Sequence, residues 1–212
     1  MSTHGWPVRS LAAQLRLPSG PAGLLVARRL NRNNREMVLA AVEASGAAPG
    51  ERVGDVGFGG ASSLGPLLTR VSPGGQVSGV EVSRTMVIRA RALLRRPIAR
   101  GSLTIELGAA TALPFAVAAL DAVITVNTVY FLPLLEPAFG ECARVLRPGG
   151  RLVICLGDPV EMADMPVTAH GFLLRPVSDV QRALTAAGLA LDGHRRAGQP
   201  PFSFHVLTAH RP

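Results

Sequence analysis

Hydrophobic residues fall into two alternating patterns along the chain. Short runs rich in Val, Ile and Leu alternate with segments in which apolar residues recur at helical spacing. This alternation is typical of parallel β-α-β units. The runs predict seven strands, at 52–57, 76–82, 103–107, 122–127, 151–156, 189–194 and 204–210, and the segments between them predict helices at 62–71, 84–94, 134–146 and 177–187. We therefore expect an α/β fold with a Rossmann-like, doubly wound sheet.

Pro and Gly residues separate several of these elements. They occur at 49–50, 73–75 and 148–150, each time where a helical pattern stops and a strand pattern starts. Ahead of the first strand, residues 24–32 and 35–44 have helical patterns. We expect a helical cap over residues 1–50 and a ligand-binding domain over residues 51–212, together forming one structural unit.

A glycine-rich loop follows the first predicted strand, in the stretch VGDVGFGGASS at 53–63. Doubly wound sheets bind ligands at the carboxyl ends of their strands. Glycines there let the backbone turn sharply and let a ligand approach closely. Ser62 and Ser63 are expected to cap the helix that follows. The third glycine of the dinucleotide-binding G-x-G-x-x-G pattern is absent.

An acidic residue, Glu81, ends the second predicted strand, 24 residues beyond Gly57. A carboxylate at this place can accept hydrogen bonds from both hydroxyls of a ribose. A solvated charge is the alternative. The glycine loop before it favours ribose binding.

Five stretches then resemble one family in order along the chain. They are VGDVGFGG at 53–60, GVEVS at 79–83, GAATALPF at 108–115, LDAVITVNTVYFL at 120–132 and ECARVLRPGGRLVI at 141–154. With them the chain resembles the class I S-adenosylmethionine-dependent methyltransferases, in the small-molecule group that includes the quinone-biosynthesis enzymes. The resemblance implies a mostly parallel sheet with an antiparallel last strand, and S-adenosylmethionine as cofactor.

The resemblance also implies which residues bind the cofactor. The methionine part would lie against the glycine loop, the ribose on Glu81, and the reactive sulfonium near the end of the fourth strand. Two asparagines of the cap could reach the cofactor's carboxylate. The predicted cofactor-binding residues are Asp55, Gly57, Phe58, Gly59, Gly60, Glu81, Val82, Ala109, Ala110, Asn127, Thr128, Asn31 and Asn34.

Two positions depart from the family pattern. Ala61 stands where the loop usually closes with another glycine, and we expect a mild effect because Ala starts helices well. Ala109 stands where the family usually carries an acidic residue that bonds the adenine amino group. Losing that acceptor would cost roughly 1–2 kcal/mol of adenine recognition unless the backbone of Ala109 and Ala110 compensates.

Candidate catalytic groups follow strands four and five. His170 and Tyr130 are the predicted catalytic residues, and Asp158 and Glu161 open the same segment as His170. Each also has a plain structural reading, as a loop polar residue or a packed ring. Apolar residues on the cap and after strand five predict a pocket for an apolar or aromatic acceptor: Leu24, Leu25, Phe131, Leu132, Met162, Met165, Phe172 and Leu173.

Composition and charge narrow the choice of partners. The 212 residues are 48% hydrophobic, with a net charge of +8 carried by arginine and no lysine. Such a composition fits a GC-rich coding sequence, although the arginine patches at 28–35 and 84–100 could attract an acidic substrate or an anionic membrane surface. Cys142 and Cys155 lie apart in apolar segments and predict neither a disulfide nor a metal site. No signal peptide or membrane span is expected, so we expect a soluble, cytoplasmic protein with no metal.

Three other functions remain open at this point. Nucleic-acid methylation is disfavoured, because a single Trp and a single Tyr offer little base stacking. The missing third glycine argues against a nicotinamide-dependent oxidoreductase, and Ala109 keeps open a non-catalytic binding or assembly module. The favoured function is in-line methyl transfer to a small apolar or aromatic molecule. The sequence leaves the acceptor and the oligomeric state undetermined.

Overall fold

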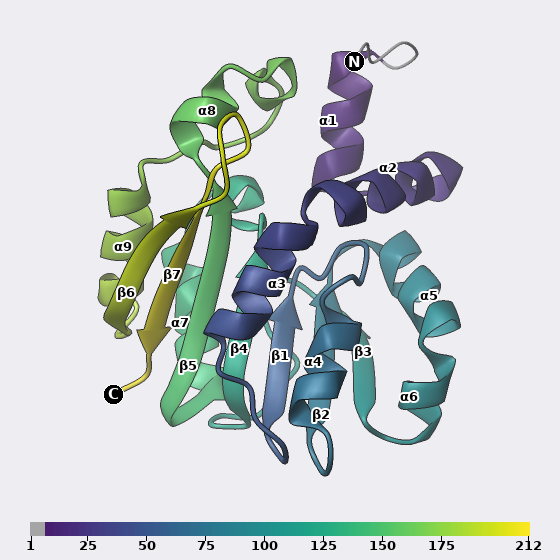
Figure 1. Cartoon of the computed structure of the whole chain (residues 1–212), viewed down its shortest axis with the longest axis vertical. Coiled ribbons are helices and arrows are strands. Elements are labelled where there is room, and N and C mark those ends of the chain that lie inside the picture. The colour runs from purple at the N-terminus through teal and green to yellow at the C-terminus, as the bar shows by residue number, and fades with distance from the viewer. Residues whose placement is uncertain (1–6) are drawn as a thin grey trace.

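One seven-stranded sheet organises the chain. The computed structural model describes residues 7–212, so the first six residues of the expected cap lie outside the described residues. The strands are β1 Arg52–Val56, β2 Gln76–Glu81, β3 Leu103–Leu107, β4 Leu120–Val126, β5 Leu146–Gly157, β6 Ala190–Ala197 and β7 Phe204–His210. Their order is β3-β2-β1-β4-β5-β7-β6 (Figure 1). Strands β1 to β5 pair in parallel, and β7 runs antiparallel to both of its neighbours, β5 and β6. The predicted doubly wound sheet with an antiparallel last strand is confirmed.

Helices connect the strands and cover both faces of the sheet (Figure 1). They are α1 Val8–Arg16, α2 Gly20–Asn33, α3 Arg35–Ala44, α4 Leu64–Val71, α5 Arg84–Leu93, α6 Arg95–Ala99, α7 Glu136–Val145, α8 Pro159–Ala163 and α9 Val177–Ala186, with 3₁₀ turns η1 Val129–Phe131 and η2 Pro166–Ala169. No helix in the described part of the chain is long and apolar enough to cross a bilayer.

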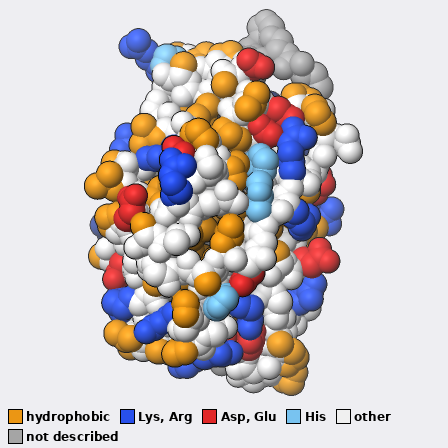
Figure 2. All heavy atoms as spheres, turned by 90° about the vertical axis from the view of Figure 1, so that its left-hand side faces the viewer, with side chains coloured by type: hydrophobic (Ala, Val, Ile, Leu, Met, Phe, Trp, Pro, Cys, Tyr) orange, Lys and Arg blue, Asp and Glu red, His pale blue; other side chains and the backbone are white. Residues whose placement is uncertain are grey.

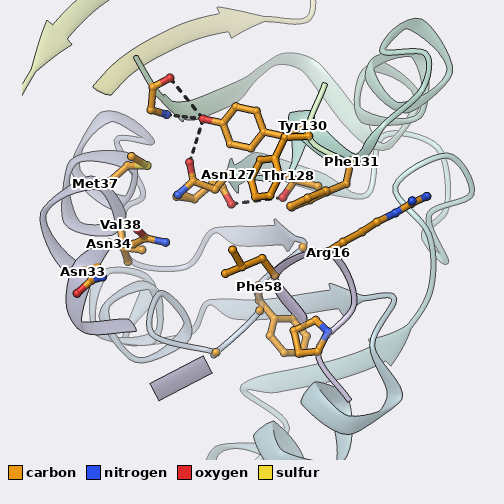
Figure 3. Close-up of a pocket in the computed structure, with 18 of the residues that line it drawn as sticks. Arg16, Asn33, Asn34, Met37, Val38, Phe58, Asn127, Thr128, Tyr130 and Phe131 are labelled. Atoms are coloured by element: carbon orange, nitrogen blue, oxygen red, sulfur yellow. Dashed lines mark hydrogen bonds between the residues drawn. The ribbon is translucent and has the colours of Figure 1, made fainter. Parts of the chain in front are cut away.

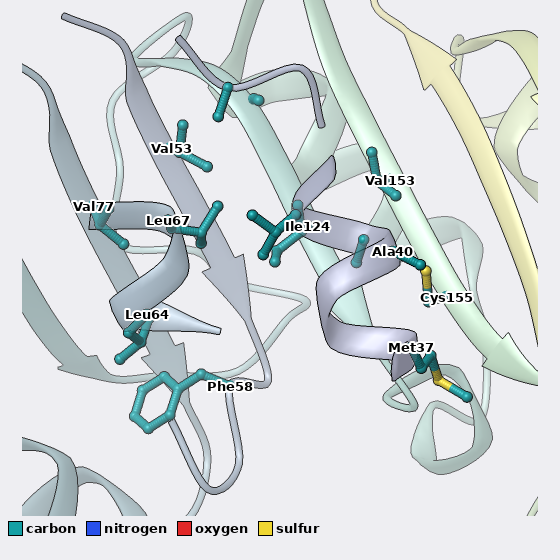
Figure 4. Packing of buried hydrophobic residues seen from close by; sticks show 14 of the residues in the cluster. Met37, Ala40, Val53, Phe58, Leu64, Leu67, Val77, Ile124, Val153 and Cys155 are labelled. Atoms are coloured by element: carbon teal, nitrogen blue, oxygen red, sulfur yellow. The ribbon is translucent and has the colours of Figure 1, made fainter. Parts of the chain in front are cut away.

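Two hydrophobic clusters pack on opposite faces of the sheet. Alternate strand residues point to opposite sides, so Ile124 and Val153 belong to one cluster and Val123 and Leu152 to the other. Helices α3, α4 and α5 supply the first cluster, and α7 and α9 the second. Figure 4 shows Met37 and Ala40 of α3 packed beside strand residues of the first cluster. Helix α3 of the expected cap is therefore an integral layer of the core.

Several element boundaries differ from the predicted ones. Helix α7 ends at Val145, and the Arg-Pro-Gly-Gly stretch expected to stop it already belongs to β5. Leu120 pairs with Leu146 and Ala122 with Arg151, so residues 147–150 bulge out of the ladder, with Gly149 in the left-handed region at φ 71°. Helix α1 was not predicted. It is short, and only Ala12 on it is buried.

Candidate functional site

A large cavity lies at the carboxyl ends of the central strands. Its volume is about 620 Å³, and ligand pockets typically measure about 300–1,000 Å³. The glycine loop, the ends of β2, β4 and β5, helices α1 to α3 and the segment after β5 surround it (Figure 3). Doubly wound sheets bind their ligands at this edge.

All thirteen predicted cofactor-binding residues line this cavity. They come from five segments far apart in the sequence: Asn31 and Asn34; Asp55, Gly57, Phe58, Gly59 and Gly60; Glu81 and Val82; Ala109 and Ala110; Asn127 and Thr128. The fold thus brings the predicted set together in one place.

The glycine loop needs its glycines for two different reasons. Gly57 has φ 78° and donates its N–H to the carbonyl of Val80 at 2.8 Å, and a Cβ at this position would overlap Thr128. Gly59 has φ 49°, and no atom lies within 4 Å of the position that a Cβ would take. The space beside Gly59 is therefore open to a ligand.

Ala61 has a left-handed backbone, with φ 67°. Its Cβ crowds the backbone there, and such a conformation costs an L-residue about 1–2 kcal/mol. The reason given for a mild effect, that Ala61 starts the helix, was wrong, because the helix begins at Leu64 and Ala61 still belongs to the turn. The expected serine caps are also wrong: Ser63 is the N-cap residue but makes no side-chain cap hydrogen bond.

Asp55 and Ser63 are joined beneath the loop instead. The Ser63 hydroxyl donates to the Asp55 carboxylate, and both side chains are buried. Burial raises the pKa of Asp55 to about 7, the Ser63 hydrogen bond opposes this rise, and the nearby Glu81 charge adds to it. The residue that was expected to cap α4 therefore holds Asp55 at the floor of the cavity.

Glu81 fastens the glycine loop to the end of β2. Its carboxylate accepts from the Gly59 N–H at 2.9 Å and from the Ser83 N–H at 2.8 Å, and the residue is only 6% exposed. Burial raises its pKa, while these backbone hydrogen bonds lower it. A carboxylate offers about four acceptor positions, so Glu81 keeps capacity to accept from a ligand.

Helix α2 contacts the glycine loop at Gly60. The Asn31 amide donates to the Gly60 carbonyl at 2.9 Å, and Arg89 of α5 donates to the same oxygen at 2.9 Å. A Cβ on Gly60 would overlap the Asn31 side chain. Gly60 is therefore needed for the contact between α2 and the loop.

Tyr130 is held by backbone groups at the end of β5. Its hydroxyl accepts from the Gly157 N–H at 2.5 Å and donates to the Asn127 Oδ1 at 3.2 Å (Figure 3). The residue is 1% exposed, and burial raises the pKa of its hydroxyl far above the usual value. Asn127 has a left-handed backbone at φ 57°, which Asn tolerates better than most residues.

Aromatic and sulfur-containing side chains line the cavity beside Tyr130. The rings of Phe131 and Phe172 pack edge to face with centroids 4.8 Å apart, and Tyr130 lies 6.2 and 5.8 Å from them. Leu132, Met162 and Met165 line the same cavity. Leu24, Leu25 and Leu173, also predicted for the acceptor pocket, are not among its lining residues, and Leu25 is 59% exposed. Five of the eight predicted apolar residues thus meet there.

Of the other polar candidates, Asp158 and Glu161 mainly form hydrogen bonds and ion pairs within the protein. His170 does not line the cavity. Asp158 caps α8 through the Val160 N–H and binds Arg196 at 2.7 Å. Glu161 lines the cavity, but its carboxylate binds Arg196 at 2.6 Å and accepts from the Ser203 N–H at 2.8 Å.

These carboxylates belong to a polar chain at the edge of the sheet. His205 contacts Asp158 at 3.3 Å and His194 at 2.9 Å. Figure 2 shows this side of the molecule, where histidine side chains lie near acidic and arginine side chains. This polar network connects α8 to β6 and β7 and so fixes this wall of the cavity.

Other lining residues were not predicted. They include Leu15, Arg16, Leu17 and Pro18; Asn33, Glu36, Met37 and Val38; Thr111; Gly157, Val167 and Thr168; and Pro201, Phe202, Ser203 and Phe204. The apolar spacing of Leu11, Ala12 and Leu15 signals α1. No sequence signal places the connection between β6 and β7 over the cavity.

Comparison with known proteins agrees with this geometry. The family described as a methyltransferase domain matches residues 54–154. Demethylmenaquinone methyltransferase of Thermus thermophilus is 35% identical over 136 residues, which cover 64% of this chain and 57% of that protein. O-methyltransferase resE of Aspergillus sclerotiorum is 31% identical over 121 residues, covering 57% of this chain and 42% of that protein.

A solved structure shares the fold over almost the whole chain. A SAM-dependent methyltransferase from Aquifex aeolicus superimposes with a TM-score of 0.69 at 21% identity, covering 97% of this chain and all of that one. The matches to the first curated relatives span about a third to a half of the length of those proteins. The family match over residues 54–154, the curated relatives and the shared fold together support a class I S-adenosylmethionine-dependent methyltransferase.

Proposed function

We propose that this protein binds S-adenosylmethionine in the cavity and transfers its methyl group to a small apolar or aromatic acceptor. The observation that carries the proposal is the buried Glu81 carboxylate bonded to the glycine loop beside open space at Gly59. The curated relatives named as methyltransferases of small molecules support the same function.

The residues present fit this cofactor. The open position beside Gly59 leaves room for a ligand against the loop, and Glu81 keeps acceptor positions for ribose hydroxyls. Val82 and Ala109 offer apolar surface for an adenine ring. Asn34 lines the cavity and makes no side-chain cap hydrogen bond to α3, so its amide is available to a carboxylate.

Thr111 offers a substitute for the acidic residue that Ala109 replaces. The Ala109 carbonyl already accepts from the Ala112 N–H at 3.1 Å, so this backbone group is partly engaged. Thr111 is exposed and lines the cavity two residues further on. We assign its hydroxyl to the adenine end of the site.

The work of the protein in methyl transfer is alignment. Bound S-adenosylmethionine supplies a methyl group already activated on a sulfonium. Phe131, Phe172 and the neighbouring methionines hold the acceptor and exclude water. Alignment of this kind can contribute roughly 7–11 kcal/mol towards a barrier. Tyr130 acts as a positioning residue here, because its hydroxyl already holds Gly157 and Asn127.

The cavity carboxylates suit an acceptor whose reacting atom ionises readily. Three of the four carboxylates that line the cavity are engaged: Asp55 with Ser63, Glu81 with two backbone N–H groups, and Glu161 with Arg196. The fourth, Glu36, is exposed on α3. A phenol or a carboxylic acid needs less help from a base than an alcohol or an amine does.

Cofactor binding and turnover test the proposal separately. Glu81→Gln should weaken binding of S-adenosylhomocysteine at least tenfold in calorimetry. Glu106→Gln, a change of an exposed carboxylate on β3, is the matched control and should bind like wild type. Methyl transfer from labelled S-adenosylmethionine is then measured over phenols, carboxylic acids, amines and RNA. Equal binding by the two variants, or transfer to RNA alone, would refute the proposal.

A further inference from the structure

We infer that the acceptor carries an anionic group, a carboxylate or a phosphate, and that Arg16 binds it at the rim of the cavity. This inference deepens the proposed function and rests on it, because it concerns the acceptor part of the same cavity. Arg16 is the only Lys, Arg or His among the described residues that line the cavity.

The position of Arg16 is fixed by its neighbours. It is the last residue of α1, and the turn to α2 is held by Gln14, which accepts from the Ser19 N–H at 2.8 Å. Pro18 is anchored to α5, since the Ser83 hydroxyl donates to its carbonyl at 2.5 Å. The backbone just after Arg16 is therefore fixed by hydrogen bonds, and it places Arg16 at the cavity.

Arg16 lines the cavity on the side of Phe131 (Figure 3). Helix α1 contacts η2, whose Val167 and Thr168 also line the cavity. In the view of Figure 3, Arg16 and Phe131 lie on the opposite side of the cavity from Met37, Asn33 and Asn34. Arg16 therefore lies on the side where we place the acceptor.

Arg16 has no carboxylate partner among the described residues. Like most of the arginines it makes no ion pair within 4 Å, but among the arginines of residues 7–212 it alone lines the cavity. Four carboxylates line the cavity and none pairs with Arg16: Asp55, Glu81 and Glu161 are engaged elsewhere, and Glu36 lies on α3. An anionic ligand group would supply the missing partner, and the planar guanidinium can bind it with two hydrogen bonds.

The chemistry of the expected acceptor is an apolar body with one acidic group. The aromatic residues bury the body, and Arg16 receives the charge where the cavity meets water. A hydrogen bond to a charged group contributes about 1.5–3 kcal/mol, so losing it should weaken binding about tenfold or more.

Binding of a matched pair of probes tests the inference. 2-Naphthoate and its neutral analogue 2-naphthamide are titrated into the full chain, with and without saturating S-adenosylhomocysteine. Wild type should bind the acid about tenfold more tightly than the amide, and salt should reduce that preference. Arg16→Gln should abolish the preference and leave amide binding unchanged. Arg9→Gln, on the same helix but outside the cavity lining, should keep it.

The outcomes separate this inference from the function beneath it. Equal affinities for the two probes, binding of neither, or a preference that survives in Arg16→Gln would overturn it. Loss of S-adenosylhomocysteine binding in Arg16→Gln would assign Arg16 to the cofactor and also overturn it. If wild type binds 2-naphthoate through Arg16 but fails to bind S-adenosylhomocysteine, the proposed function fails and the anion site stands.

Discussion

Replacing Gly57 by alanine should weaken the fold through two separable terms. The left-handed φ of 78° costs an alanine about 1–2 kcal/mol. The added Cβ would also overlap the Thr128 hydroxyl and come within 3.1 Å of its Cγ2, and overpacking of this kind costs about 1–3 kcal/mol. Gly57→Ala should therefore lower the free energy of unfolding by about 3 kcal/mol.

A double-mutant cycle separates the two terms. Thr128→Ala alone should cost about 1 kcal/mol or less, because its hydroxyl makes only long contacts of 3.4 Å to the carbonyls of Val56 and Val126. In the Gly57→Ala/Thr128→Ala double variant the two closest contacts disappear and only the Cβ of residue 128, 3.3 Å away, remains, so the coupling should be about 1–3 kcal/mol. Gly59→Ala has the same backbone cost with no atom within 4 Å, and it is the control.

Urea unfolding at equilibrium measures all four proteins against wild type. Gly57→Ala should be clearly less stable than Gly59→Ala. Adding Thr128→Ala to Gly57→Ala should recover most of this difference in unfolding free energy. Equal stabilities of the two single glycine variants, or additive effects in the double variant, would refute the steric reasoning. Both glycine variants should bind S-adenosylhomocysteine less well, since both alter the loop.

Three further changes test the floor and turn of the site. Asp55→Asn removes a group whose pKa rises from 3.8 to about 7 on folding; wild type should lose about 4 kcal/mol relative to this variant as the pH rises from about 4 to 8, and parallel urea-derived stability curves would contradict this. Ala61→Gly relieves the left-handed φ of 67°, so the urea midpoint should rise by the equivalent of about 0.5–1 kcal/mol, and a fall would contradict the strain. Tyr130→Phe leaves the buried Gly157 N–H without its partner, so urea unfolding should show a loss of about 1–3 kcal/mol, with the pH profile of methyl transfer unchanged; a shifted profile would make Tyr130 a proton carrier.

Local patterns predicted most of the framework. The strands at 103–107 and 204–210 and the helix at 35–44 have the predicted bounds, because apolar periodicity and flanking breakers agree there. The predicted cofactor residues also meet, since parallel strands carry their carboxyl ends to one edge of the sheet. These features depend on short stretches of sequence.

Features that depend on tertiary contacts escaped prediction. Ala61 has a left-handed backbone because the turn requires it. Alanine as a residue type disfavours that conformation, so the sequence alone argues against it. Serine is a favoured helix-capping residue, yet the Ser63 hydroxyl donates to Asp55 instead, because a buried carboxylate needs a hydrogen-bond donor. Arg16 and Phe202 reach the cavity only through the way α1 and the connection between β6 and β7 fold over it.

The central claim is that the glycine loop and Glu81 form a site for S-adenosylmethionine. Its most direct test is a calorimetric titration of the full chain with S-adenosylhomocysteine, with NAD as the comparison ligand. We predict micromolar binding of S-adenosylhomocysteine, weakened at least tenfold in Glu81→Gln and kept in Glu106→Gln, and no binding of NAD. Absence of S-adenosylhomocysteine binding, or preference for NAD, would contradict it.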